Sequence, residues 1–399
     1  MNQTAAGIPP HVPPARVFDF DFVGDPLLSP DPHKGLLELA KRAPGIFFTP
    51  RYGGHWVVQS HEAVFHVAHD TDTFSSNAGA KRQLLPIATD PPEHRNYRSV
   101  LLQAFAPKNV NAMLPMIREM IVELIENVAS SGRCDFVTDV AEPLPVIIFM
   151  RMLGLPVENM AELRRLIIAV LAEGDAVRRD AIFEEQLETI LNPIIKGRMA
   201  QREDDMISRI LDARLGERHP TFDEMQRYLL LLTNAGLDTV TNAMSFAMLH
   251  LARDTELQER LRQERQLVPA IVEEFLRRYA VSSVLRSVTR DAEYDGVHFQ
   301  PGDRVHLLVP AANLDGKVFT DPEEIILNRD IPPVTFGTGI HRCLGSHLAR
   351  LELRNVLVEW FDRVPAFRLN PDDVPVMHAG LVYTVDRLPL VWSGKTAHA

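Results

Sequence analysis

Apolar residues recur every three or four positions through most of the stretch between residues 91 and 279. This spacing places them on one face of an α-helix and predicts a mainly helical region. The pattern is clearest in residues 110–129, 143–155, 160–171 and 187–199. Short apolar runs bounded by Gly, Pro and Asp predict strands. They occupy residues 53–59, 305–309 and 388–391. We therefore expect a mainly α protein with small β-sheets.

One helix start is signalled by Asp90-Pro91-Pro92-Glu93. We expect Asp90 to cap this helix, with Pro91 at its first position and Glu93 completing a capping box. His94 and Arg98 would then lie on one face, because they are four residues apart.

A second capping box, at residues 221–224, predicts a helix that continues to about Ala252. At roughly thirty residues it would be far longer than an average helix. Its second half is apolar enough to resemble a membrane span, but polar residues and a glycine interrupt its centre. These are Asn234, Gly236, Asp238, Thr239, Thr241 and Asn242. An apolar helix with a polar centre is typical of the middle of a large protein.

The composition is that of an enzyme-sized globular protein. The chain has 399 residues, and 46% of them are hydrophobic, enough to fill a sizeable core. No repeat, low-complexity tract or Gly/Ser linker divides it, so we expect a single domain over residues 1–399, with residues 1–20 as an extended, proline-rich segment.

The N-terminus lacks a basic and apolar signal pattern, which favours a cytoplasmic protein. The net charge of −11 disfavours nucleic acids and anionic membranes as partners.

Cys343 lies in a segment with distinctive chemistry, Phe336-Gly337-Thr338-Gly339-Ile340-His341-Arg342-Cys343-Leu344-Gly345. With Cys134 as the second cysteine, the chain cannot form a disulfide framework or a four-thiolate site, so a functional cysteine would act alone. An apolar helix pattern follows at residues 344–357, and a helix N-terminus stabilises a thiolate. The glycines allow close approach of a flat ligand. A buried core cysteine is the competing interpretation. A zinc site with His341 and His347 is weaker, because too few ligands converge.

The segment resembles the haem-binding loop of the cytochrome P-450 family. The family pattern Phe-x-x-Gly-x-x-x-Cys-x-Gly is met by Phe336, Gly339, Cys343 and Gly345, with Gly337 in the same loop. Further family motifs occur in the family's order. Glu274 and Arg277 match its Glu-x-x-Arg ion pair, and residues 235–239 match the oxygen-binding groove of its long central helix. The resemblance implies a triangular helical prism around a buried haem b, with Cys343 as the axial iron ligand and O2 as co-substrate.

The haem propionates require basic partners, of which the resemblance implies His94, Arg98 and Arg286, and His341 is a further basic candidate. A buried histidine with ordinary core partners is the alternative interpretation of His94.

Over its whole length the chain is similar to the bacterial camphor-hydroxylase group. The similarity lies in residues 9–13, 17–21, 53–56, 236–240 and 388–392. Two departures matter. Val284 stands where the group has an aspartate beside a propionate, and the loop of residues 74–90 contains no tyrosine to anchor the camphor ketone. We therefore do not expect camphor itself to be the substrate.

Oxygen activation is assigned by the resemblance to Gly236, Asp238 and Thr239. Thr239 would hydrogen-bond the reacting oxygen, Asp238 would pass protons from solvent, and Gly236 would let the helix open where O2 binds. A thiolate ligand pushes electron density onto iron and favours O–O cleavage, which supports oxygen insertion into a C–H bond. The competing interpretation is a threonine that bonds back to its own helix beside a structural aspartate.

By resemblance, six residues surround the substrate together with residues 74–87. They are Leu231, Asn234, Ala235, Val284, Leu381 and Val382. Such residues predict an apolar cavity with few polar anchors. Asn234 would either contact the substrate or hydrogen-bond within its helix. We expect a terpenoid or norisoprenoid substrate, such as an ionone-like ketone.

Electrons must come from another protein, because the chain has no flavin or nicotinamide fingerprint and too few cysteines for an iron–sulfur cluster. The resemblance implies NADH, a flavin-dependent reductase and a [2Fe–2S] ferredoxin. An acidic ferredoxin would dock near Arg95, Arg98, Arg342 and Arg350, which could also be ordinary surface arginines. Two other functions remain open at this point: a peroxide-driven peroxygenase or isomerase, and a non-catalytic haem sensor.

Overall fold

The computed structural model describes residues 7–77, 82–172, 176–236 and 238–393. Its α-helices are α1 (Pro32–Arg42), α2 (His61–His69), α3 (Glu93–Leu102), α4 (Pro107–Ala112), α5 (Leu114–Ala129), α6 (Pro143–Leu153), α7 (Met160–Ala172), α8 (Ala176–Gln186), α9 (Asn192–Ala200), α10 (Met206–Asp212), α11 (Phe222–Ala235), α12 (Asp238–Arg253), α13 (Thr255–Gln263), α14 (Val268–Arg278), α15 (Val309–Ala312) and α16 (Ser346–Arg363). Its strands are β1 (Ile46–Thr49), β2 (His55–Val58), β3 (Phe74–Ser75), β4 (Arg133–Asp135), β5 (Val284–Val288), β6 (Ala292–Tyr294), β7 (Val297–Phe299), β8 (Arg304–Leu307), β9 (Phe367–Leu369), β10 (Val376–His378), β11 (Thr384–Arg387) and β12 (Pro389–Trp392). The mainly α architecture with small sheets is therefore confirmed.

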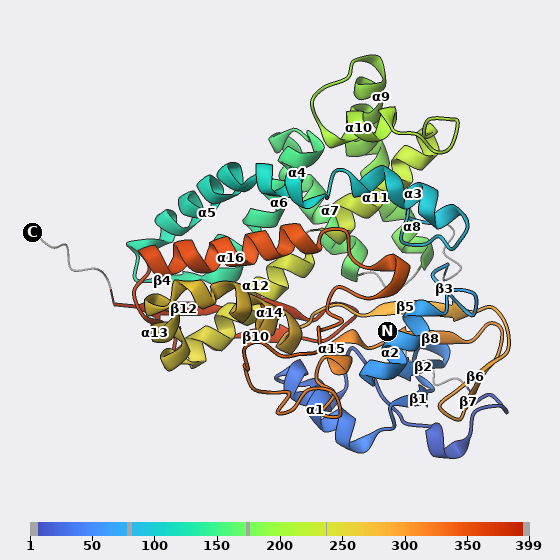
Figure 1. The fold of residues 1–399 in the computed structure, drawn as a ribbon. Helices are drawn as coiled ribbons and strands as arrows, with labels where there is room; N and C mark the ends of the chain where they lie inside the picture. The colour runs from blue at the N-terminus through green and yellow to red at the C-terminus, as the bar shows by residue number, and fades with distance from the viewer. Residues whose placement is uncertain (1–6, 78–81, 173–175, 237, 394–399) are drawn as a thin grey trace, which may run out of the picture.

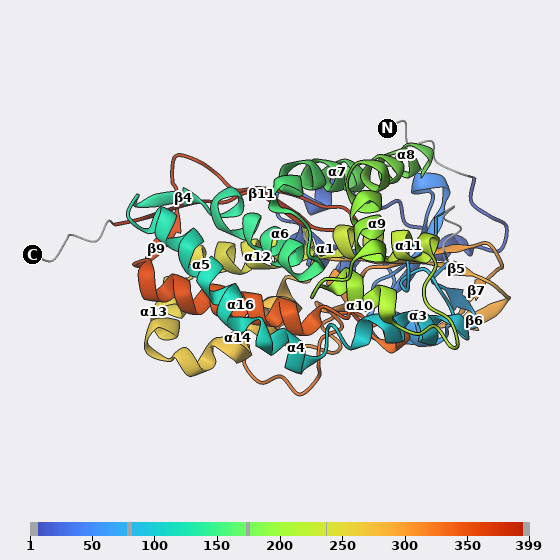
Figure 2. The same ribbon diagram turned by 90° about the horizontal axis from the view of Figure 1, so that it is seen from above.

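Helices make up the larger part of the molecule. Figure 1 shows α5 running beside α16, and α12 packs against both α14 and α16. Seen from above in Figure 2, α7 and α8 lie side by side along one edge. The largest core cluster joins α5, α12, α14 and α16, and within it Trp360 packs edge-on against Phe136. Burying such apolar faces is what holds helices of this length together.

The predicted helices are present, with local changes at their starts. Residues 110–129 form α4 and α5, which are separated at Met113. Residues 187–199 begin with one π-helical turn, Leu187–Leu191 (η6), before α9. Each of α4, α5 and α9 has a proline in its first turn, where a missing N–H breaks no helical hydrogen bond.

The long central helix is not continuous. Its capping box forms as predicted, because Thr221 accepts a hydrogen bond from the Glu224 amide and Glu224 accepts one from the Thr221 amide. However, α11 ends at Ala235 and α12 begins at Asp238. The chain needs room here, since a Cβ atom on Gly236 would lie 2.6 Å from the Phe149 ring. The predicted helix to about Ala252 is therefore divided into α11 and α12 at Gly236, the position at which we expected the helix to open.

The predicted cap at Asp90 is also wrong. Helix α3 begins at Glu93, and its N-cap position is Pro92, without a side-chain cap. The Asp90 carboxylate instead accepts hydrogen bonds from the Ser75 hydroxyl at 2.5 Å and the Ser76 amide at 2.9 Å. The Asp90 carboxylate thus binds residues that are distant in the sequence instead of capping α3.

The principal sheet has five strands in the order β1-β2-β8-β5-β3. Strands β2 and β8 are parallel, and the other neighbours are antiparallel. In Figure 1 this sheet lies with α1 and α2 at one end of the molecule, away from α5 and α13. Strand β12 joins β4 and β9 in a second sheet, and β10 and β11 form a separate hairpin. Among the described residues, no helix is long and apolar enough to cross a membrane.

Candidate functional site

The loop that carries Cys343 is closed by its own backbone. The Cys343 amide donates to the Phe336 carbonyl at 2.8 Å, and the Gly337 amide donates to the Val334 carbonyl at 2.8 Å. Gly337 and Gly339 adopt φ values of 68° and 69°, a region that favours glycine. At Gly339 space is also lacking, because a Cβ atom there would lie 2.6 Å from the Ala68 carbonyl oxygen of α2.

The surroundings of the Cys343 sulfur act in opposite directions on its ionisation. Burial raises the pKa of the thiol above its usual value. A hydrogen bond from the Gly345 amide and the charges of Arg98, Arg350 and Arg342 favour the thiolate. These groups suit a sulfur whose negative charge is balanced further by a metal ion.

Three basic side chains, two of them buried and His341 partly buried, converge beside this loop. The rings of His94, from α3, and His341 meet at a centroid distance of 4.4 Å. Arg286, from β5, is buried and donates to its neighbouring Leu285 carbonyl at 2.8 Å. Burial lowers the pKa of Arg286 to about 10, partly opposed by Asp90. Burial, followed by the charge of Arg286, lowers the pKa of His341 to about 3, and burial also lowers the pKa of His94.

Within the described part of the chain, these groups form no ion pair or hydrogen bond with an acidic side chain, although the charge of Asp90 acts on His94 and Arg286. The Nε2 atoms of His94 and His341 are buried and have no hydrogen-bond partner there. Buried polar atoms are normally paired, so an anion with several oxygen atoms fits this position. A haem propionate has this chemistry, and the nearby cysteine is the remaining group that a haem requires. The donor set therefore fits haem.

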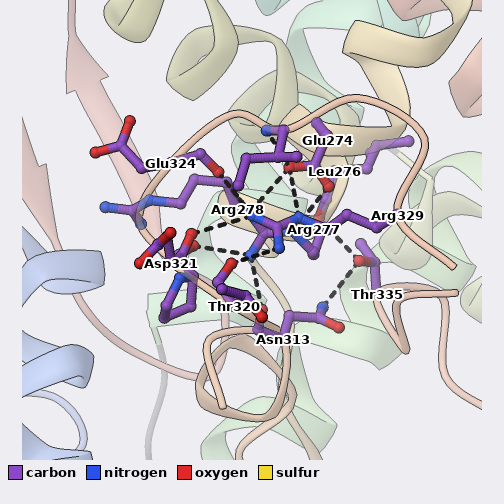
Figure 3. A network of polar contacts seen from close by, with 12 residues as sticks. Glu274, Leu276, Arg277, Arg278, Asn313, Thr320, Asp321, Glu324, Arg329 and Thr335 are labelled. Carbon is purple, nitrogen blue, oxygen red and sulfur yellow. Dashed lines mark hydrogen bonds and ion pairs between the residues drawn. The ribbon is translucent and has the colours of Figure 1, made fainter. Parts of the chain in front are cut away.

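A network built on Glu274 and Arg277 holds the segment that precedes the cysteine loop (Figure 3). Both side chains are buried, and two N–H groups of Arg277 donate to the two Glu274 oxygens at 2.9 and 3.0 Å. Arg277 also donates to the carbonyls of Asn313, Pro322 and Glu324. Arg329 donates to Glu274 at 3.1 Å, so the carboxylate has a second cation. The expected buried ion pair is present in this structure.

The same network reaches the loop through Asn313. Its side-chain oxygen accepts from the Val334 amide at 2.8 Å, and its amide nitrogen donates to the Thr335 hydroxyl at 2.9 Å. Thr335 in turn donates to the Leu276 carbonyl of α14 (Figure 3). The residues immediately before Phe336 are thus tied to α14. Reasoning from the sequence missed Asn313 and Arg329, because no local spacing links them to Glu274.

Asp238 and Thr239 begin α12, directly after the interruption at Gly236. Burial raises the pKa of Asp238 above its usual range, while a hydrogen bond from Asn242 opposes this effect. The Thr239 hydroxyl donates to the Ala235 carbonyl at 3.4 Å, the back-bonding geometry that we considered as an alternative. Asp238 is therefore a largely desolvated carboxyl group whose surroundings favour its protonated form.

The residues expected around the substrate fall into two groups. Leu231, Asn234 and Ala235 lie on the last turns of α11, next to the interruption. Val284 begins β5, and the turn that carries Leu381 and Val382 is bound beside it. The Ser283 amide donates to the Leu381 carbonyl at 2.8 Å, and an isolated bridge joins Ser282 to Val382. Leu381 remains 39% exposed although it is apolar.

Asn234 is engaged within the protein. Its amide nitrogen donates to the Leu230 carbonyl at 2.8 Å and to the side-chain oxygen of Gln186 at 3.1 Å. Gln186 is buried and also donates to Thr233 at 2.9 Å. One amide hydrogen of Asn234 thus bonds within α11, and the other joins α11 to α8. Of the two expected roles of Asn234, contact with the substrate or hydrogen bonding within its helix, this arrangement corresponds to the second.

The four arginines expected at a docking surface differ in availability. Arg350 donates to Glu273 at 2.7 and 2.9 Å, and its guanidinium lies 4.5 Å from the Phe336 ring centre. Arg98 is half-buried and donates to the Arg342 carbonyl. Arg95 and the Arg342 side chain are exposed. A partner would therefore meet Arg95 and Arg342 first.

Comparisons with known proteins agree with this site. A model of the cytochrome P-450 family matches residues 176–376. The probable cytochrome P-450 127A1 of Sinorhizobium fredii is 33% identical over 97% of this chain and 97% of its own length. Nocardicin C N-oxygenase of Nocardia uniformis is 31% identical over 92% of this chain and 97% of its own length. The crystal structure of CYP101J2 has 35% identity and a TM-score of 0.90, covering 97% of this chain and 100% of that one.

The chain therefore belongs to the cytochrome P-450 family. It is an oxidoreductase that incorporates oxygen from O2, and haem b is its cofactor.

Proposed function

We propose that this enzyme hydroxylates a C–H bond of a small terpenoid or norisoprenoid, such as an ionone-like ketone. Electrons would come from NADH through a flavin-dependent reductase and a [2Fe–2S] ferredoxin. The observation that carries the substrate class is the apolar character of the residues that we assign to the substrate. Ala235, Leu381 and Val284 are apolar yet not buried.

In this proposal the Cys343 thiolate would hold the haem iron, and Phe336, Gly337, Gly339 and Gly345 would shape the loop around it. His94, Arg98, Arg286 and His341 bind the propionates. The haem supplies O–O cleavage and the oxidant for the C–H bond. The unpartnered Nε2 atoms of His94 and His341, within the described residues, support this assignment.

Asp238 and Thr239 would deliver protons to the oxygen being reduced, while Gly236 leaves space at the helix interruption. Proton delivery needs a side chain that both binds and releases a proton near neutral pH. The raised pKa of Asp238, caused by burial, supports this role. Thr239 would release its 3.4 Å contact with the Ala235 carbonyl to hydrogen-bond the oxygen.

The substrate would be recognised mainly by shape and by burial of apolar surface. Leu231, Ala235, Val284, Leu381 and Val382 offer no hydrogen-bonding side chains. Asn234 has no amide hydrogen left for a substrate ketone while it binds Leu230 and Gln186. Each buried CH₂ group would contribute about 0.8 kcal/mol to binding. Affinity should therefore rise with the number of ring and methyl carbons more than with the presence of a ketone.

An acidic ferredoxin would dock on the side of the cysteine loop, around Arg95 and Arg342, with Arg98 and Arg350 behind them. The exposure of Arg95 and Arg342 supports this surface. Attraction between opposite charges would speed the encounter and weaken with added salt.

The first test is the absorption spectrum of the reduced protein with carbon monoxide, for the wild type and for Cys343→Ala. A strongly red-shifted Soret band that is lost in the variant is the expected result for thiolate ligation. Titration with ionones and monoterpenes should then shift the iron spin state, and NADH with a ferredoxin system should yield a hydroxylated product. Turnover with peroxide alone, or haem binding without NADH consumption, would instead favour a peroxygenase or a sensor.

A further inference from the structure

Asn242 lies on α12, one helical turn after Asp238, and its side chain is completely buried. Its amide nitrogen donates to the Asp238 carboxylate at 3.1 Å and to the Asp238 carbonyl at 2.9 Å. Its side-chain oxygen accepts from the Val385 amide of β11 at 2.9 Å. One side chain therefore joins the catalytic carboxylate to a strand that follows it by more than a hundred residues.

Strand β11 belongs to a hairpin that reaches both parts of the site. At its stem, His378 of β10 contacts Asp386 of β11, with 2.8 Å between Nδ1 and the carboxylate oxygen. At its tip, Leu381 and Val382 are bound to the residues that precede β5. The hairpin thus runs from the substrate residues to the neighbourhood of Asp238.

The charged groups that act on Asp238 also come from this hairpin. His378 lowers and Asp386 raises the pKa of Asp238, and the hydrogen bond from Asn242 lowers it. Within the described residues, the influences opposing burial therefore come from Asn242 and from the β10–β11 hairpin.

We propose that Asn242 is a positioning residue that orients the Asp238 carboxylate for proton delivery and couples it to the β10–β11 hairpin. This inference rests on the proposed role of Asp238 in oxygen activation. A substrate that presses on Leu381 or Val382 would act on the strand that Asn242 holds, so substrate occupancy and proton supply are linked.

The chemistry of asparagine explains why this residue type is needed. Holding Asp238 and β11 together requires a donor and an acceptor on one short side chain, and an amide has both. Neither alanine nor leucine supplies these contacts, although both favour the helix more. The Asn242 hydrogen bond stabilises the ionised carboxylate, so its loss should raise the proton affinity of Asp238 and free its orientation.

The test compares Asn242→Ala with Ser245→Ala in the haem-loaded enzyme. Ser245 is an equally buried residue on α12 whose hydroxyl donates to the Thr241 carbonyl at 2.8 Å, so it controls for the loss of a buried hydrogen bond. An infrared pH titration, with the Asp238 band identified by its loss in Asp238→Asn, should show a raised Asp238 pKa in Asn242→Ala alone. An unchanged pKa would overturn the inference, whatever the activity.

Coupled turnover gives the second readout. We expect Asn242→Ala to lower product formed per NADH about fivefold or more, with more peroxide, because placed proton donors contribute factors of about 10² to 10⁴. The same substitution in an Asp238→Asn background should have no further effect, whereas equal losses in both backgrounds would indicate a merely structural role.

If Asn242→Ala does not fold, Asn242→Asp replaces it. That variant keeps an acceptor for the Val385 amide and should shift the pH profile of coupled turnover to higher pH. A profile at the same pH as in the wild type would contradict the inference. If the wild type has no NADH-dependent turnover while the infrared shift is present, the proposed function fails and the positioning role stands.

Discussion

Phe149 of α6 packs so closely against Gly236 that a Cβ atom at position 236 would lie 2.6 Å from a ring carbon. This contact coincides with the end of α11 at Ala235. The interruption beside Asp238 therefore lies where an aromatic ring of another helix leaves no room for a side chain.

Gly236→Ala should consequently destabilise the protein, because Phe149 or the backbone must move. Overpacking of this kind costs about 1–3 kcal/mol in the free energy of unfolding. Urea unfolding of the haem-loaded protein measures the cost. Gly197→Ala on α9 is the matched control, since a Cβ atom at position 197 would meet nothing within 4 Å, and it should be neutral or stabilise by roughly 0.5–1 kcal/mol. Equal stabilities for the two variants would show that the Phe149 contact is not restrictive.

Replacing Arg286 by methionine should accelerate haem release. The variant keeps most of the buried volume but removes a charged donor, and hydrogen bonds to charged groups contribute about 1.5–3 kcal/mol. Release to an excess of apomyoglobin should become about tenfold faster or more, since each 1.4 kcal/mol is roughly a factor of ten. His347→Gln, on the exposed side of α16, should release haem at the wild-type rate. An unaltered rate in Arg286→Met would argue against a propionate contact.

Glu274→Gln should strongly destabilise the fold and impair haem retention. The substitution leaves the buried Arg277 without its compensating charge, and breaking such a pair costs about 3–5 kcal/mol. It also weakens the bonds to Ile326 and Arg329 that hold the segment leading to Phe336. The exposed pair Arg165 and Glu162 provides the control, because Glu162→Gln should leave the free energy of unfolding close to that of the wild type. Similar losses in both variants would contradict this distinction.

Glu352 predicts a pH dependence of stability. It is buried on α16, and burial raises its pKa to about 8. The unfolded chain loses this proton near pH 4.5, whereas the folded protein keeps it until about pH 8, so ionisation favours unfolding between these values. Stability should fall with rising pH across this window, by at most about 1.4 kcal/mol per pH unit.

Chemical unfolding of Glu352→Gln at pH 5, 6.5 and 8 measures this contribution. The variant should match the wild type at the acidic end and become the more stable of the two at the alkaline end. Glu119→Gln, on the exposed face of α5, should leave the slope as it is in the wild type. A Glu352→Gln slope identical to that of the wild type would show that this carboxyl ionises normally in the folded protein.

The sequence by itself determined those features that depend on neighbours along the chain. Apolar spacing predicted the helices, and the capping box at Thr221 and Glu224 formed as expected. The pattern from Phe336 to Gly345 identified the family, because glycine conformations and the cysteine position are local requirements. The ion pair of Glu274 and Arg277, one helical turn apart, was implied by the family motif that these residues match.

Tertiary structure decided what depends on residues that are distant in the sequence. The bonds from Ser75 and Ser76 hold Asp90 away from the helix that it could cap, and α11 ends next to the close contact of Gly236 with Phe149. His94, Arg286 and His341 converge from α3, β5 and the cysteine loop, and Asn242 meets Val385 across the core. Hydrogen-bond partners and close packing are set by the folded chain as a whole. A periodic pattern therefore predicts an element, but not which side chain a polar group in that element will contact.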